Sequence, residues 1–496
     1  MTNLACQKAV RLAGAILVAP VIAVVFSATA ASASYQFDSS FGTTNGFTRT
    51  TDPEVQVTYS TVKLSNGKLV VGAMNFDTGD VEVSQYTSAG LIDTSFSGPD
   101  GKFSVTLPGI GTTAAETVNV GVQSSGKIVV AGSFYDTTTG YNDLYAMRLD
   151  STGVIDPTFG TAGQTLVHSP LGVMSGKAMA IGSDDSIVLV GNINGATQRM
   201  LVTKFDADGT LDASFGLGGG VETVIDNGSD ANDVVIQSDG KIVVTGYAIA
   251  SKKYQVVVRY LTTGALDTSF GVGGIAAVDF GVQDNEGSQI RLASDGNIYV
   301  GGVIYSSDKN VYINRLNPSG SMDTTYNGGG VRVFNNSGNE EVRYFELLSD
   351  GSTIMFVVSE NDWLIVKFDA SGSNDFSFND GDYRIWISVP DDNPLPTAGF
   401  LLSGGEIVVV GHTQQGGADI ILARFMDPTA VTTTTTTTTT VASTTTTTSA
   451  HHSTTTVAVP ESTLPPTGAR AGTTFGWIFA LLSVGLGLVV VRRRTT

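Results

Sequence analysis

The chain has 496 residues and a formal net charge of −19, with 15% charged residues, 59 glycines and one cysteine. This acidity argues against nucleic-acid binding, and the low charge content argues against a charged disordered chain. The one cysteine, Cys6, lies in a segment expected to be removed, which excludes disulfides and thiol chemistry from the mature protein.

Residues 1–33 have the pattern of a secretory signal peptide. Lys8 and Arg11 supply the positive charge, and a short apolar stretch follows them. An Ala-Ser-Ala sequence at 31–33 is the expected cleavage site, with Ala-Thr-Ala at 28–30 as the alternative. The apolar stretch is short for a membrane span, so an uncleaved anchor is the less favoured interpretation.

An Asp-x-x-aromatic element recurs seven times in the middle of the chain. Successive aromatic residues are 55, 63, 56, 55, 56 and 52 positions apart, which indicates a repeat of about 55 residues. The pairs are Asp38/Phe41, Asp93/Phe96, Asp156/Phe159, Asp212/Phe215, Asp267/Phe270, Asp323/Tyr326 and Asp375/Phe378.

A two-residue turn recurs in register with this element. Asx-Gly between two β-branched runs predicts a hairpin with a type I′ turn, in which both central residues have positive φ. Asp185-Ser186 departs from the pattern and is expected to form the least ideal turn. The seven turns are Asn66-Gly67, Ser125-Gly126, Asp185-Ser186, Asp239-Gly240, Asp295-Gly296, Asp350-Gly351 and Gly404-Gly405.

Two runs within each unit resemble the delta-60 repeat, a β-propeller repeat of bacterial proteins. They are clearest as SDGKIVVTG at 238–246 with LDTSFGVGG at 266–274, and again at 124–132 with 155–163. The resemblance covers residues 37–426 and implies a β-propeller. It implies no particular activity.

We therefore predict an all-β fold, a seven-bladed β-propeller over residues 34–427 with four antiparallel strands per blade. Residues 37–42 contain an Asp-x-x-aromatic element, which ends a repeat unit, but no unit precedes it. The last β-run of the repeat region has no such element after it. The N-terminal segment is therefore expected to complete the last blade, which removes exposed sheet edges. Around Asp239-Gly240 the predicted strands are 220–225, 233–237, 242–246 and 255–260.

Alternation of strand direction predicts how the connections are sorted. The Asx-Gly turns and the Asp-x-x-aromatic corners should share one face, with each aromatic packed between blades and each Asp accepting backbone N–H bonds. The irregular connections should share the other face, which we expect to bind a ligand. They are residues 226–233, 283–287, 335–341, 391–396, 135–142 and 248–254.

The C-terminal region has three further parts. Residues 428–463 are rich in threonine and predict an extended, disordered stem that is a candidate for O-glycosylation. The motif Leu464, Pro465, Pro466, Thr467, Gly468 follows, and residues 469–496 contain an apolar transmembrane segment and three arginines.

This order resembles the LPxTG sorting signal of Gram-positive surface proteins. The resemblance implies that a sortase cleaves after Thr467 and joins this residue to peptidoglycan. The expected location is the cell wall, with membrane contact only through the C-terminal segment before sorting. A simple single-pass anchor is the alternative, and it has the same outward topology.

Few residues offer catalytic or metal chemistry. The four histidines, His168, His412, His451 and His452, have no metal-ligand spacing on one element, so zinc-type catalysis lacks evident ligands. No Gly-x-Ser-x-Gly setting accompanies His168 or His412.

Calcium is the favoured cofactor hypothesis, because clustered carboxylates are its usual ligands. Asx-rich turns also form without a metal, so a purely structural role is the favoured interpretation and no cofactor is expected, with calcium as the possible exception. The candidate ligands are Asp226, Asp230, Asp233, Asp380 and Asp382.

Removal of both terminal segments takes away six basic residues, so the mature charge is −19 − 6 = −25. We expect a non-enzymatic surface protein that binds an extracellular glycan or protein. The alternatives are a wall-displayed polysaccharide hydrolase and a structural display protein without a specific ligand. Exposed aromatics on the loop face, such as Trp386, would favour binding, although Trp386 is equally compatible with a core position.

Overall fold

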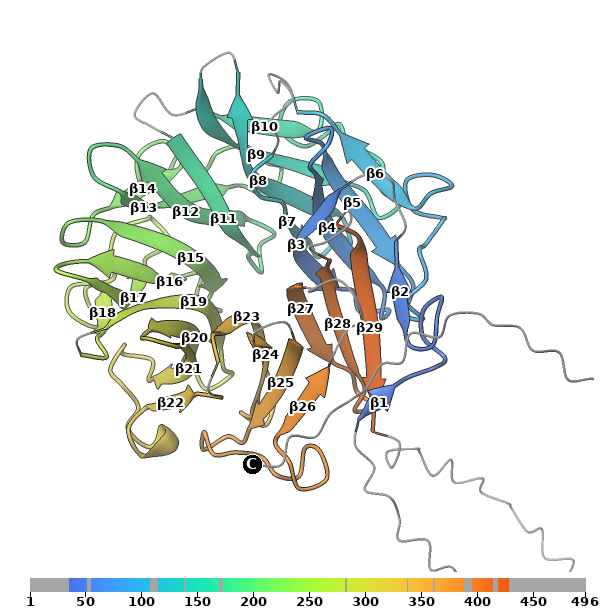
Figure 1. The fold of residues 1–496 in the computed structure, drawn as a ribbon. Coiled ribbons are helices and arrows are strands. Elements are labelled where there is room, and N and C mark those ends of the chain that lie inside the picture. The colour runs from blue at the N-terminus through green and yellow to red at the C-terminus, as the bar shows by residue number, and fades with distance from the viewer. Residues whose placement is uncertain are drawn as a thin grey trace, which may run out of the picture.

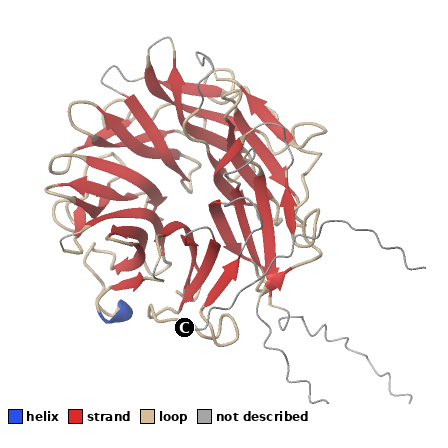
Figure 2. Cartoon of the chain, in the orientation of Figure 1, coloured by secondary structure: helices blue, strands red, loops and turns tan. Residues whose placement is uncertain are grey.

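The computed structural model describes residues 35–50, 55–107, 115–137, 140–168, 173–281, 283–336, 338–359, 362–387, 395–413 and 418–427. Seven antiparallel sheets surround a central axis (Figure 1), and strands make up nearly all the regular structure (Figure 2). This confirms the predicted all-β, seven-bladed β-propeller.

The predicted signal peptide, stem, sorting motif and C-terminal span lie outside the described residues. Within the described ranges, no helix is long and apolar enough to cross a membrane.

Each blade is a meander, and its first strand lies nearest the axis (Figure 1). We number the blades along the chain and label their strands a to d from the axis outward. Blade 1 contains β3 (Gln56–Lys63), β4 (Leu69–Asn75), β5 (Val81–Tyr86) and β6 (Lys102–Val105). Blade 2 contains β7 (Asn119–Val122), β8 (Ile128–Asp136), β9 (Tyr141–Leu149) and β10 (Gln164–Val167). Blade 3 contains β11 (Val173–Ile181), β12 (Ile187–Asn194), β13 (Arg199–Phe205) and β14 (Gly220–Thr223).

The other four blades follow the same plan. Blade 4 contains β15 (Ser229–Ile236), β16 (Ile242–Ile249), β17 (Lys253–Tyr260) and β18 (Ile275–Val278). Blade 5 contains β19 (Asp284–Leu292), β20 (Ile298–Tyr305), β21 (Lys309–Leu316) and β22 (Val331–Phe334), with a 3-10 turn, η1 (Tyr326–Gly328), before β22. Blade 6 contains β23 (Glu340–Leu347), β24 (Thr353–Ser359), β25 (Asp362–Phe368) and β26 (Arg384–Ile387). Blade 7 contains β27 (Leu395–Leu401), β28 (Ile407–His412) and β29 (Ile420–Met426).

The N-terminal segment completes blade 7. Two short strands, β1 (Gln36–Phe37) and β2 (Phe47–Arg49), both pair antiparallel with β29. The predicted closure of the ring is therefore confirmed. Blade 7 gains its outer strand from the opposite end of the chain, so β29 does not remain an open sheet edge.

The predicted grouping of strands into blades is wrong by one strand. Residues 220–225 were expected to be the first strand of the blade around Asp239-Gly240, but β14 pairs with β13 and is the outer strand of the preceding blade. Blade 4 starts at β15, and its outer strand is β18. A repeat in the sequence sets the spacing of the strands but not the point at which one sheet ends.

The hairpin turns are also of a different type from the one predicted. At Asn66-Gly67, the Gly67 N–H donates to the Leu64 carbonyl at 2.9 Å, and only the glycine has positive φ, at 81°. A type I turn followed by a left-handed glycine has this geometry, whereas type I′ needs positive φ at both residues. In blade 3 the glycine position is taken by Asp185, with φ 63°, so the equivalent pair is Asp184-Asp185.

In blades 1 to 6 the Asp-x-x-aromatic elements form the corners between strands c and d, and in blade 7 the element lies between β1 and β2. Every corner aromatic packs between two blades. Phe270, for example, lies in one cluster with Val243 of blade 4 and Ile298 of blade 5. This confirms the interblade position that the repeat predicted. All seven are at most 6% exposed: Phe41, Phe96, Phe159, Phe215, Phe270, Tyr326 and Phe378.

The aspartate of each corner connects the turn to a cation. In blade 4, one oxygen of Asp267 accepts hydrogen bonds from the Ser269 N–H at 3.1 Å and its hydroxyl at 2.6 Å. The other oxygen accepts a hydrogen bond from Arg259 Nε at 2.8 Å, and the guanidinium lies 4.5 Å from the centroid of the Phe270 ring. The carboxylate, the cation and the buried aromatic ring thus form one contiguous unit.

The corner aspartate pairs with a cation in all seven blades, and in five of them the cation also lies over the corner ring. These hydrogen bonds and charges hold the pKa of each corner carboxyl below its ordinary value. For Asp267 the main causes are the bonds from Ser269 and the charge of Arg259. For Asp212, the bond from Lys204 followed by that from Ser214 lowers the pKa to about 2. The other pairs are Asp38 with Arg424, Asp93 with Lys68, Asp156 with Arg148, Asp323 with Arg315 and Asp375 with Lys367.

Truncating a corner aromatic should open a cavity between two blades. We expect Phe270→Ala to lower the free energy of unfolding by about 3–5 kcal/mol, the usual cost of removing a buried phenyl ring. Val272→Ala is the matched control, because Val272 is two positions away and 88% exposed. Urea denaturation followed by circular dichroism measures both variants, and equal losses would contradict the interblade role of the ring.

The lowered pKa values predict acid sensitivity. A carboxyl whose pKa is lower in the folded state stabilises the protein above pH ~4, and this contribution is lost as the pH falls toward the folded pKa. We expect Asp267→Asn to reduce stability by about 1–3 kcal/mol at pH 7. Its difference from the wild type should shrink as the pH falls from about 4 to 2, because the unfolded carboxyl takes up a proton over this range while the folded one stays ionised.

The control for this experiment is Asp308→Asn, which changes an exposed carboxylate between β20 and β21. Urea titrations at several pH values measure all three proteins. A deficit of Asp267→Asn that stayed constant down to pH 2 would show that the charge of Asp267 does not stabilise the corner.

Candidate functional site

The connections separate onto two faces of the ring, as predicted. Strands alternate in direction, so the a–b turns and the c–d corners lie on one face, the corner face. The b–c and d–a connections lie on the other, the loop face. Residues 226–233 and 283–287 connect strand d of one blade to strand a of the next, and residues 248–254 span a b–c hairpin, so all three lie on the loop face.

A β-bulge recurs at one level of the innermost strand. In six blades the pairing of strand a with strand b shifts register by one residue. Bulges commonly redirect a side chain, and all six bulged residues are partly exposed in this part of the ring. They are Tyr59, Lys177, Asn232, Ser288, Arg343 and Thr397.

Several bulges link neighbouring blades. Lys177 Nζ donates to Asp230 Oδ2 at 2.6 Å and to Asn232 Oδ1 at 3.2 Å. Asn232 Nδ2 in turn donates to the Gly287 carbonyl of the next blade at 2.9 Å. These polar groups therefore serve to align the blades around the axis. Sequence analysis missed them because single bulged positions leave no periodic signal.

The predicted calcium ligands of blade 4 have protein partners. Exposed Asp226 accepts a hydrogen bond from the Tyr254 hydroxyl at 2.6 Å, and buried Asp230 accepts one from Lys177. Asp233 accepts the Ile290 N–H of the next blade at 2.9 Å, although burial raises the pKa of its carboxyl.

The other two candidate ligands, Asp380 and Asp382, lie between strands c and d of blade 6, on the corner face. Asp382 Oδ1 accepts hydrogen bonds from the backbone and side chain of Arg384, both at 3.1 Å. The five aspartates are thus divided between two faces, and calcium binding by them stays a prediction.

The exposed aromatic side chains of the loop face are not the one that the sequence suggested. Trp386 lies on β26 in the core between blades 5 and 6, which confirms the core alternative for this residue. Other aromatics at the ends of b–c hairpins are between 36% and 49% exposed on the loop face: Phe76, Tyr135, Tyr141 and Tyr305. Their exposure could not be predicted, because they differ from core aromatics only by their place at the strand ends.

Two of the histidines lie within the described residues, and they differ in setting. His412 is buried at the end of β28, and its Nδ1 lies 3.0 Å from the Thr58 hydroxyl. Burial, with a smaller contribution from the charge of Arg343, lowers the pKa of His412 to about 4. It is therefore a neutral core histidine at physiological pH.

His168 is instead half-exposed and lies among carboxylates. Its Nδ1 is 2.5 Å from Asp143 Oδ2 and 3.9 Å from Asp136 Oδ2. Among the residues that the structure describes, these three form the one group of three acidic or histidine side chains with converging ligand atoms, all within 4.8 Å of one another. Sequence analysis missed the group because its members come from three different strands or strand ends.

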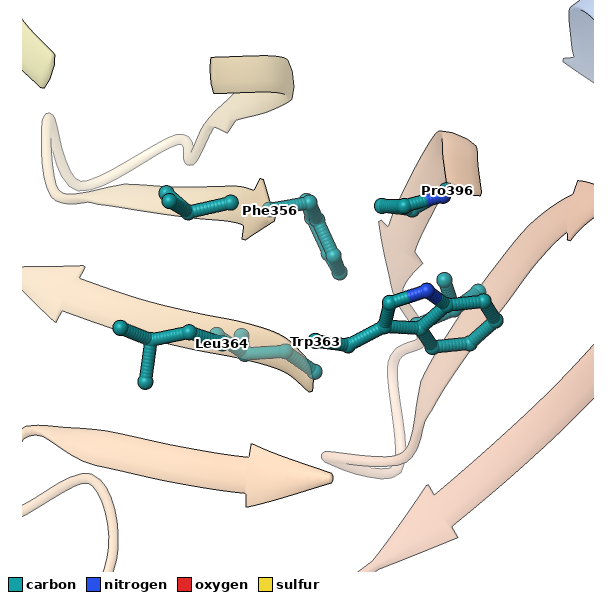
Figure 3. A pocket seen from close by; sticks show the side chains of 7 residues that line it. Phe356, Trp363, Leu364 and Pro396 are labelled. Atoms are coloured by element: carbon teal, nitrogen blue, oxygen red, sulfur yellow. The ribbon is translucent and has the colours of Figure 1, made fainter. Parts of the chain in front are cut away.

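An apolar gap lies between blades 6 and 7. Figure 3 shows Phe356, Trp363, Leu364 and Pro396 around it, and the remaining lining is also aliphatic. It is too narrow to hold a water molecule. It is therefore a packing defect, and the polar groups that a ligand site needs are absent from its lining.

Comparison with known proteins finds a family match for part of the repeat region. Four segments of the chain match the family described as "Domain of unknown function (DUF5122) beta-propeller". The matched residues are 123–159, 182–215, 237–270 and 293–326. Each DUF5122 segment begins at the a–b turn and ends at the corner aromatic of one blade, so the matched unit contains the turn, strands b and c, and the corner. No curated protein matches the sequence.

Solved structures show only distant likeness. A polysaccharide lyase, Uly1, has 9% identity and a TM-score of 0.47, and the match covers 76% of this chain and 91% of that one. An ulvan lyase of family PL25 has 10% identity and a TM-score of 0.44, over 75% and 95% of the two chains. The β-propeller domain of the Trilobed protease from Pyrococcus furiosus has 11% identity and a TM-score of 0.39, over 74% and 94%. With TM-scores below 0.5, these likenesses carry no argument about activity.

Proposed function

We propose that this protein is a wall-displayed binding module that recognises an extracellular glycan through its loop face. The observation that carries the proposal is the set of exposed aromatics at the b–c hairpins, Phe76, Tyr135, Tyr141 and Tyr305. Aromatic rings held at the ends of rigid strands supply flat apolar surface at low entropic cost. Such rings stack on the apolar faces of sugar rings.

The charge of the loop face fits the same ligand class. Exposed aspartates lie in its connections, and carboxylates accept hydrogen bonds from sugar hydroxyls. A mature charge of −25, from −19 − 6, disfavours anionic polymers, so a neutral or cationic glycan is the better match. The exposed residues are Asp77, Asp226, Asp279, Asp284 and Asp308.

The display part of the proposal rests on the sequence. The LPxTG-like motif at 464–468, the threonine-rich stem before it and the signal peptide at 1–33 support attachment to a Gram-positive cell wall. A sortase would join Thr467 to peptidoglycan, and the stem would hold the ring away from the wall.

Binding is favoured over hydrolysis by the roles of the axial carboxylates. Glu346, on the innermost strand of blade 6, accepts the Leu401 N–H of blade 7 at 2.5 Å. Asp233 holds the backbone of blade 5 in the same way. These acids join neighbouring blades, whereas a glycosidase needs two carboxyls that face a shared substrate.

The test is a glycan and extracellular-matrix array probed with residues 34–427, which contain the whole closed ring, with and without calcium. We expect a discrete hit that weakens about tenfold or more when Tyr135 and Tyr141 are both replaced by alanine. Tyrosines that become buried on binding commonly contribute a large share of the binding energy. The matched control replaces Leu217 and Val272, which are exposed on the corner face.

If the control lost the hit and the tyrosine variant kept it, binding would be on the corner face, which would contradict the proposal. A blank array with a ring shown to be folded would contradict binding and favour a structural display role. A hit on a matrix protein alone would support the loop face as the binding surface but contradict a glycan as its ligand.

A further inference from the structure

Three potential metal ligands meet at the loop-face end of blade 2. Asp136 is the last residue of β8, Asp143 lies on β9 and His168 follows β10, so three adjacent strands bring them together. Both aspartates are buried, whereas the imidazole is 53% exposed. The cluster therefore has a fixed, buried side and an accessible side.

One atom of the cluster is unsatisfied. Asp143 is 1% exposed, and its Oδ2 contacts His168 Nδ1 at 2.5 Å. Its other oxygen, Oδ1, is buried and has no hydrogen-bond partner in the described part of the chain. A buried carboxylate oxygen without a partner is costly, and an ion pair with His168 satisfies only Oδ2. A cation bound through Oδ1 would satisfy this oxygen.

We propose that Asp136, Asp143 and His168 bind a divalent transition-metal ion. The imidazole nitrogen distinguishes the cluster from a calcium-type site of oxygens alone, and imidazole and carboxylate groups are both ligands that zinc accepts. Ligand atoms on a tetrahedral zinc ion lie about 3.4 Å apart, from bonds of about 2.1 Å. The 2.5 Å and 3.9 Å separations from His168 Nδ1 bracket that value, so small movements of the half-exposed ring complete the geometry.

Three protein ligands leave a coordination position open, as in zinc sites that exchange their fourth ligand. The open side is the exposed side of His168, and the hairpin that carries Asp136 and Asp143 also presents Tyr135 and Tyr141 to solvent. Tyr141 pairs directly with Asp136 across the hairpin and so lies on the face of the sheet that carries the cluster. The metal site itself does not depend on the proposed glycan binding, because metal binding is measured without any glycan.

The experiment is calorimetric titration of zinc chloride into metal-stripped protein, residues 34–427, at pH 7.5. This range excludes His451 and His452, which would otherwise bind zinc weakly. We expect one zinc per chain and a melting temperature that rises with zinc. His168→Ala should abolish binding, and Asp143→Asn should weaken it at least tenfold.

The matched control is Asp239→Asn, which changes an exposed aspartate of the corner face and should leave zinc affinity unchanged. Circular dichroism shows whether each variant is folded, and His168→Ala is the safer variant because that side chain is half-exposed. Absence of zinc binding would overturn the proposal. So would binding at one zinc per chain that survives both His168→Ala and Asp143→Asn.

Discussion

The ring depends on one repeated contact, the carboxylate that joins a cation to a buried aromatic at each c–d corner. The aromatic fills the interface with the next blade, and the carboxylate holds the cation to the turn. At five of the seven corners the cation also lies over the aromatic ring. At Phe270 the backbone continues the link, because the next residue, Gly271, donates its N–H to Ser319 of blade 5 at 2.8 Å. Each corner thus fixes the angle between two blades as well as closing one sheet.

Because the corners hold the blades together, the two faces of the ring differ. The corner face repeats the same residues in each blade because each blade must meet its neighbour at the same angle. The loop face carries no such constraint, so its connections vary in length and composition. The exposed tyrosines and the cluster of His168 with Asp136 and Asp143 lie there, on strand ends that the corners hold in place. A rigid ring with variable loops is a general arrangement for binding sites.

The repeat allowed the fold class, the blade number, the closure by the N-terminal segment and the interblade aromatics to be predicted, because each leaves a periodic or terminal signal. The predicted first strand of the blade and the predicted turn type were wrong. The turn type could not be predicted, since the same Asx-Gly sequence fits both type I′ and type I with a glycine bulge. The cluster around His168 was missed, because its ligands are adjacent only across strands. The predicted sorting motif at 464–468 lies outside the described residues and stays a prediction.

Amide hydrogen exchange of the ring, residues 34–427 at neutral pH, tests most directly whether the corners hold the structure. The account predicts that surface turns at the corners, such as residues 267–274, exchange nearly as slowly as the central strands, because their amides are bonded within the corner and to the next blade. The loop-face hairpins at 250–252 and 306–308 should exchange far faster. Equally fast exchange at corners and hairpins would contradict the central role of the corners.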